Sequence, residues 1–136
     1  MHAVQGLCLA NRRTNRHLLD FRGRLEREGS GFFLAMDASI CLEYPADTPV
    51  TVVPADLSFM GEMRLDAGNC PIRVMQAESP HTDDATLILV PEEGLLFLGG
   101  ACCDPFEGGA RDPALCRKLA ETIAESGAER CKVGFE

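Results

Sequence analysis

Two short apolar runs joined by a turn form the clearest hydrophobic pattern in the chain. The runs span residues 86–90 and 95–98, and the segment Pro91-Glu92-Glu93-Gly94 stands between them. Apolar, β-rich runs of this length that are bounded by turn residues predict the two strands of a β-hairpin. Because nearly every position of both runs is apolar, both faces of the pair need cover. This pattern indicates inner strands of a layered α/β protein.

Shorter apolar segments before the hairpin predict a meander of strands. We expect strands at residues 57–59, 62–65 and 72–77, with turns at 60–61 and 66–69. A last strand is expected at residues 130–133.

A helix over residues 113–126 is predicted after the hairpin. Asp112 is its expected N-cap, Pro113 occupies the first helical position, and Gly127 supplies the residue after its end. We expect this helix to pack on the hairpin, against Leu87, Leu89 or Phe97. The apolar stripe that would make the contact consists of Leu115, Leu119, Ala120, Ile123 and Ala124.

The N-terminal third predicts a second helix, over residues 15–28, with Thr14 as its cap and Gly29 after its end. His17 lies beside its apolar face and is interpreted as a surface or packing residue rather than a ligand. One or two strands are expected within residues 32–44, with a helix as the alternative for their first part. Prolines then mark a loop in which residues 51–53 are extended.

The chain has 136 residues, which is enough for one domain that buries roughly two-thirds of its unfolded surface. Its charge is uneven. Residues 1–28 hold six Arg and three carboxylates, a net charge of +3, whereas residues 29–136 have a net charge of −11, which gives −8 for the whole chain. The acidic body argues against a nucleic-acid partner. The Arg-rich start is interpreted as a solvated helix face, with an anion-binding patch as the alternative.

The chain contains seven cysteines and no Cys-x-x-Cys pair. An odd number of cysteines without a recognisable secretory signal favours reduced thiols and a cytoplasmic location. No apolar run approaches the ~20 residues of a membrane span, so a membrane is not an expected partner.

Three motifs around the hairpin occur in the order found in one known fold. Pro80-His81-Thr82 opens the first strand, Pro91-Glu92-Glu93 makes the turn, and Leu96-Phe97-Leu98-Gly99 ends the second strand. This order resembles the C-terminal part of the metallo-β-lactamase fold, whose enzymes are mostly zinc-dependent hydrolases. The resemblance covers residues 48–136, about two-thirds of the chain. It implies an α/β fold with a partial αββα layer, in which an antiparallel or mixed sheet carries helices on one face.

The same comparison shows that most metal ligands of that family are missing. Its His-x-His-x-Asp-His motif does not occur, its bridging Asp falls on Gly100, and its final His falls on Phe135. Only His81 of the usual set remains. The resemblance therefore implies a single domain over residues 1–136 that lacks the N-terminal metal-binding half.

Five residues are candidates for a site. His81, Asp83 and Asp84 could bind a metal weakly, and zinc is the ion that the resemblance suggests, although no cofactor is expected. The alternative is a polar loop in which an Asp caps backbone N–H groups. Cys102 and Cys103 could replace the missing ligand at Gly100 or form a nucleophilic pair with His81. The alternative for both is an ordinary small side chain beside a turn.

These observations favour a non-catalytic domain, a pseudo-enzyme or binding protein that self-associates. The 113–126 helix can cover one face of the hairpin, and the other face would expose more apolar surface than monomers usually do, even if residues 15–28 and 32–44 cover part of it. We therefore expect a homodimer. The alternative is a metal-dependent hydrolase with an atypical site around His81 or one completed by a second chain. The sequence names neither a substrate nor a ligand.

Overall fold

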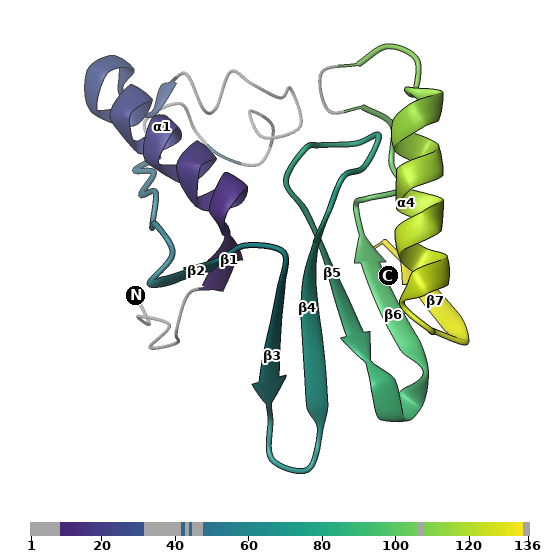
Figure 1. Ribbon diagram of the computed structural model, residues 1–136. Helices are drawn as coiled ribbons and strands as arrows, with labels where there is room; N and C mark the ends of the chain where they lie inside the picture. The colour runs from purple at the N-terminus through teal and green to yellow at the C-terminus, as the bar shows by residue number, and fades with distance from the viewer. Residues whose placement is uncertain (1–8, 32–41, 43, 45–47, 106–107, 135–136) are drawn as a thin grey trace. The chain divides into compact units, whose positions relative to one another are not determined.

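The computed structural model describes residues 9–31, 42, 44, 48–105 and 108–134 (Figure 1). The chain is an α/β protein that divides into two compact units, Met1–Ser58 and Phe59–Glu136. Within the described residues, no helix is long and apolar enough to cross a membrane. That residues 1–136 form one domain stays a prediction.

The first unit contains strand β1 (Leu9–Asn11) and helix α1 (Arg12–Glu28). The expected cap at Thr14 is wrong. The side-chain oxygen of Asn11 accepts hydrogen bonds from the backbone N–H groups of Arg13 (2.9 Å) and Thr14 (3.0 Å), so the helix begins three residues earlier than predicted. It ends at Gly29, as expected. None of the described residues of α1 is buried, and His17 is exposed.

Residues 50–55 lie along α1 and the residue that follows its end. Asn15 accepts a hydrogen bond from the backbone of Ala55 at 2.9 Å, and Ser30 accepts one from Val50 at 3.3 Å. Residues 51–53 lie between these contacts and belong to no strand. Strand β2 (Leu57–Phe59) pairs with β1 in a two-stranded sheet. The strands predicted within 32–44 lie outside the described residues, apart from positions 42 and 44.

The second unit is built on a five-stranded mixed sheet in the order β3-β4-β5-β6-β7. Neighbouring strands are antiparallel except β6 and β7, which are parallel. The strands predicted at 62–65 and 72–77, the hairpin and the last strand are confirmed in this sheet, whereas the strand predicted at 57–59 is β2, which pairs with β1 and does not continue the meander. The strands are β3 (Glu62–Asp66), β4 (Pro71–Ala77), β5 (Ala85–Val90), β6 (Leu95–Gly99) and β7 (Arg130–Val133).

The hairpin turn also anchors the last strand. Its residues form the 3-10 helix η1 (Pro91–Glu93), and Gly94 follows with a φ of 55°, a left-handed conformation that favours glycine. The carbonyl of Gly94 accepts hydrogen bonds from the backbone N–H groups of Glu129 (2.8 Å) and Arg130 (3.0 Å). The start of β7 is therefore fixed to the tip of the hairpin.

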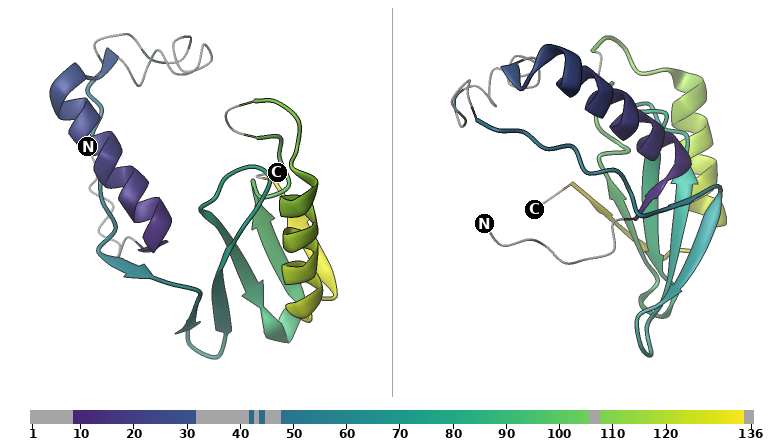
Figure 2. Two further views of the ribbon diagram at one scale, coloured as in Figure 1. Left: turned by 45° about the horizontal axis from the view of Figure 1, so that its top comes forward. Right: turned by 90° about the vertical axis from the view of Figure 1, so that its left-hand side faces the viewer.

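Helix α4 (Pro113–Glu125) lies along one face of this sheet (Figure 2). It begins as predicted, since the Asp112 carboxylate accepts a hydrogen bond from the Ala114 N–H at 2.8 Å. Leu119 is 4% exposed, and Ile123 packs beside it partly buried. The alanines 120 and 124 are exposed, contrary to expectation. Each follows an inward residue by one position, which turns it about 100° away around the helix.

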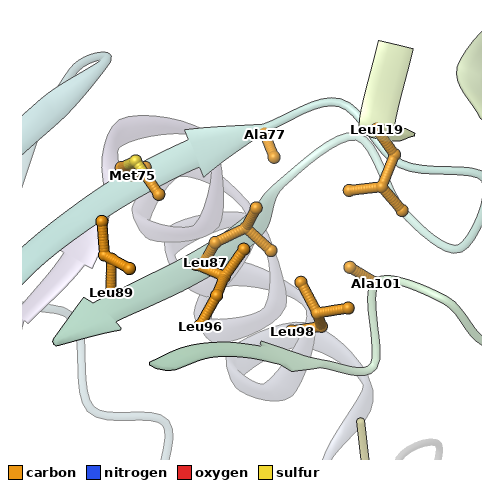
Figure 3. Packing of buried hydrophobic residues seen from close by; sticks show 8 residues of the cluster. All are labelled: Met75, Ala77, Leu87, Leu89, Leu96, Leu98, Ala101 and Leu119. Atoms are coloured by element: carbon orange, nitrogen blue, oxygen red, sulfur yellow. The ribbon is translucent and has the colours of Figure 1, made fainter. Parts of the chain in front are cut away.

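The core lies between α4 and the sheet (Figure 3). Its members on β4, β5 and β6 alternate along each strand and therefore share one face. Of the predicted partners of α4, Leu87 and Leu89 share the buried cluster with Leu119, as expected, whereas Phe97 alternates with Leu96 and Leu98 and so points to the other side of the sheet. The buried cluster consists of Met75, Ala77, Leu87, Leu89, Leu96, Leu98, Ala101 and Leu119.

The face of the sheet turned away from α4 is also apolar. Strand pairing aligns Met63 with Val74, Val74 with Ile88, and Ile88 with Phe97, so these side chains form a row across β3, β4, β5 and β6. Ile88 and Phe97 are each 39% exposed, whereas Val74 in the middle is 5% exposed. We call this surface the opposite face. It comprises Met63, Leu65, Ile72, Val74, Ile88, Val90, Leu95 and Phe97.

Candidate functional site

The hairpin brings His81 and Gly100 together. His81 precedes β5 and Gly100 follows β6, and these two ends meet because the strands are antiparallel. A Cβ atom at Gly100 would lie 3.4 Å from Cδ2 of His81 and 3.5 Å from its Nε2. The same atom would lie 3.9 Å from Sγ of Cys103. The side chains of His81 and Cys103 therefore both lie near the position that a side chain at Gly100 would occupy.

A backbone hydrogen bond sets the orientation of the His81 ring. Its Nδ1 lies 2.5 Å from the carbonyl oxygen of Asp104. A carbonyl can only accept a hydrogen bond, so Nδ1 carries the proton, and the lone pair of the neutral ring is on Nε2. Nε2 is the ring nitrogen near Gly100. The Asp104 carboxylate in turn accepts a hydrogen bond from Nε of Arg111 at 3.0 Å.

Hydroxyl groups shape the loop that carries His81. The buried Ser79 donates to the carbonyl of Thr82 at 2.9 Å and accepts from the Thr82 N–H at 3.2 Å. The Thr82 hydroxyl donates to the Asp84 carboxylate and accepts from the Asp84 N–H. The loop is thus held by local side-chain-to-backbone bonds, as in the predicted alternative of a polar loop. The backbone N–H groups of Thr82 and Asp84 are capped by hydroxyl groups.

The three proposed metal ligands do not converge. Among the residues that the structure describes, no group of three or more His, Cys, Asp or Glu side chains could hold a metal ion. Asp84 is bonded to Thr82, Asp83 is exposed, and His81 faces Gly100. The Gly100 position supplies no ligand, and Phe135 lies outside the described residues. Metal binding by His81, Asp83 and Asp84 remains a hypothesis without a converging ligand set.

The neighbouring cysteines differ in their surroundings. Cys103 is exposed, and its N–H donates to the Gly100 carbonyl at 2.9 Å, which closes a tight turn. Cys102 is partly buried and packs against the core. Burial raises the pKa of the Cys102 thiol, and the nearby thiols of Cys103, Cys131 and Cys116 raise it further. Cys102 fits the interpretation of an ordinary packed thiol. The Cys103 thiol instead lies near the Cβ position of Gly100, as the His81 ring does.

An ion-pair cluster lies on the α4 side of the sheet, at β3 and β4. The carboxylate of Glu62 accepts hydrogen bonds from Arg73 (2.6 and 3.0 Å) and from Arg64 (3.1 Å). These bonds, with Arg73 first, lower the pKa of Glu62 to about 2. Hydrogen bonding to Glu62 likewise raises the pKa of Arg73. This cluster could not be predicted from local sequence patterns, because its members come from two strands whose pairing has to be known first.

No protein-family model matches the chain, and no curated protein matches it. The resemblance to the metallo-β-lactamase fold therefore rests on the three motifs and stays a hypothesis.

Proposed function

We propose that this protein is a non-catalytic domain with metallo-β-lactamase-like layering that acts by self-association. The observation that carries the proposal is the opposite face of the sheet. Helix α4 covers the other face, while the opposite face carries the eight apolar residues named above across four strands, of which Leu65, Ile88 and Phe97 are exposed and Val74 is buried. Soluble monomers rarely expose contiguous apolar patches larger than a few hundred Å².

A second copy of the chain is the occupant that this surface suits best. Ile88 and Phe97 stand directly opposite each other in the pair β5–β6, and each keeps 39% of its surface exposed. A two-fold axis near these two residues would pack Ile88 and Phe97 of one chain against the same two residues of the second copy, as in isologous dimers. Lys132, next to Phe97 on β7, would lie at the polar rim. The interface would bury on the order of 2,000 Å² in total.

The proposed absence of catalysis rests on residue identity. A catalytic zinc requires three protein ligands and an open position for water. The family's bridging carboxylate has Gly100 in its place, its final His has Phe135, and its four-ligand motif does not occur. A non-catalytic role needs only the layered scaffold.

The free thiols of the described cysteines suit the reducing cytoplasm that we expect for the protein.

A charge placed in the centre of the opposite face tests this proposal. We expect Ile88→Lys to weaken the dimer by at least about thirtyfold, the effect of losing a hot spot worth about 2 kcal/mol. Sedimentation equilibrium measures the dissociation constant. Val53→Lys is the matched control, since Val53 is 61% exposed and lies in the other unit. Equal dissociation constants for both variants and the wild type, with folding verified by circular dichroism, would contradict the proposal.

A further inference from the structure

Strand β3 is an outer strand of the five-stranded sheet, and among the described residues its outer edge pairs with no other strand (Figure 1). Its residues are exposed except Met63, which is half-buried. Such an edge presents backbone N–H and C=O groups with which another chain can pair. We propose that the outer edge of β3 binds an extended segment of a partner protein, the guest strand, which adds to the sheet as one further antiparallel strand. This inference does not depend on the proposed self-association.

The hydrogen bonds between β3 and β4 show which residues of β3 face outward. The N–H of Gln76 donates to the carbonyl of Gly61 at 2.7 Å, and past the end of β3 the N–H of Ala67 donates to the carbonyl of Cys70 at 3.1 Å. In an antiparallel pair, every second residue is bonded to the neighbouring strand. The odd-numbered residues of β3 therefore face β4. The even-numbered residues turn their backbone groups outward, and they are Glu62, Arg64 and Asp66.

The outward residues give this edge an alternating charge. Their side chains share one face of the sheet and are negative, positive and negative in the order Glu62, Arg64, Asp66. Nε of Arg64 donates to the Glu62 carboxylate at 3.1 Å, and the Arg64 side chain is still 81% exposed. The middle of the edge is therefore a cation that a carboxylate of a guest strand can reach from solvent.

This order of charges disfavours a second copy of the chain as the guest. If two β3 strands paired antiparallel over their full length, Arg64 would lie opposite Arg64, and Glu62 would lie opposite Asp66. Like charges at directly opposite positions are destabilising. A shifted register avoids these pairs, but it leaves an outward residue of each strand without a backbone partner. A partner segment with the complementary charges uses all of the outward residues.

The same positions define the sequence of the guest strand. A segment in the order basic, apolar, acidic, apolar, basic places an acidic residue opposite Arg64 and basic residues opposite Glu62 and Asp66. Its apolar residues then lie on the other face of the sheet, beside Met63 and Leu65, and Leu65 is 39% exposed. The backbone bonds hold the guest strand, and the side chains select it.

A linear peptide with the core Lys-Val-Glu-Val-Lys is the probe for the first test. It is titrated at millimolar concentration into the isotope-labelled full chain, and amide chemical shifts are followed by NMR. We expect shifts along β3. The charge-reversed core Glu-Val-Lys-Val-Glu should bind at least about tenfold more weakly, because it sets like charges opposite all of the outward residues.

Three outcomes of this titration would overturn the proposal. The first is the absence of peptide-induced shifts in β3, and the second is an equal affinity for the two cores. The third is an apparent dissociation constant for the peptide that rises with protein concentration, which would show that a second copy occupies the edge.

Methylation of single peptide nitrogens tests the pairing through the backbone. In the proposed register the N–H of the central Glu donates to the carbonyl of Arg64, whereas the N–H groups of the Val residues point away from β3. We expect N-methylation of the Glu to weaken binding at least about tenfold and N-methylation of one Val, the matched control, less than about threefold. Equal effects would show that the peptide binds through its side chains alone and would refute the added strand.

Arg64→Glu tests the charge at the middle of the edge. The variant should prefer the core Lys-Val-Lys-Val-Lys over Lys-Val-Glu-Val-Lys, which is the reverse of the wild-type preference. Because both peptides are compared on the same protein, a general change in its stability does not alter their order, and circular dichroism verifies the fold. A preference that stays as in the wild type would refute the role of Arg64.

Discussion

Gly100 lies against the imidazole of His81, so closely that a Cβ at position 100 would be 3.4 Å from the ring. The two residues are brought together by the β5–β6 hairpin. In the family that the motifs resemble, both positions belong to the metal site. Here one of them has no side chain, and the space beside His81 is shared with Cys103.

We predict that the protein purifies without a stoichiometric metal. Its described residues provide no set of three converging ligands, and a lone His binds zinc weakly. Elemental analysis after expression in zinc-supplemented medium should give well below one zinc per chain. A chelator should leave the melting temperature unchanged. Close to two zinc ions per chain, or a chelator-sensitive turnover of a lactam, thioester or phosphodiester, would contradict this prediction.

Leu119 should be the most costly residue of α4 to truncate. It is 4% exposed and is the only described residue of the helix inside the buried cluster. We expect Leu119→Ala to lower the free energy of unfolding by about 2–5 kcal/mol in urea, because it removes buried methyl groups and leaves a cavity. Leu115→Ala is the matched control, and its half-buried position predicts a smaller loss. Equal losses would show that α4 is packed differently.

The Glu62 cluster predicts a loss of stability in acid. Because the pKa of Glu62 is about 2 in the folded chain and ordinarily 4.5, its contribution is present above pH 4.5 and disappears as the pH falls toward 2. The difference in free energy of unfolding between wild type and Glu62→Gln should therefore shrink over that range. Arg73→Gln should remove most of the same contribution, since Arg73 is the main cause of the shift. A difference that is independent of pH would contradict this assignment.

Most of the second unit could be predicted from local signals. The hairpin follows from two apolar runs around Pro91 and Gly94, and α4 follows from the cap pair Asp112-Pro113. The direction of individual side chains was harder to predict. Phe97 belongs to an unbroken apolar run, so its face is set by alternation with Leu96 and by the register with β5. No local pattern reveals that register.

The first unit and the site show other limits of the sequence. Asn and Thr are both good N-cap residues, so the sequence alone does not choose between Asn11 and Thr14. The structure shows that the Asn11 side chain accepts hydrogen bonds from two backbone N–H groups. At the site, the proximity of His81 and Gly100 followed from the hairpin. The hydroxyl bonds of Ser79 and Thr82 were missed, although a Ser three residues before a Thr in a polar loop could have indicated them.

The mass of the protein in solution tests the central claim most directly. Multi-angle light scattering at low micromolar concentration should give twice the 14.7 kDa mass of one chain, because the opposite face needs a partner to bury Ile88, Phe97 and their neighbours. A folded monomer of 14.7 kDa at that concentration would show that the chain covers this face itself, and self-association would then be wrong.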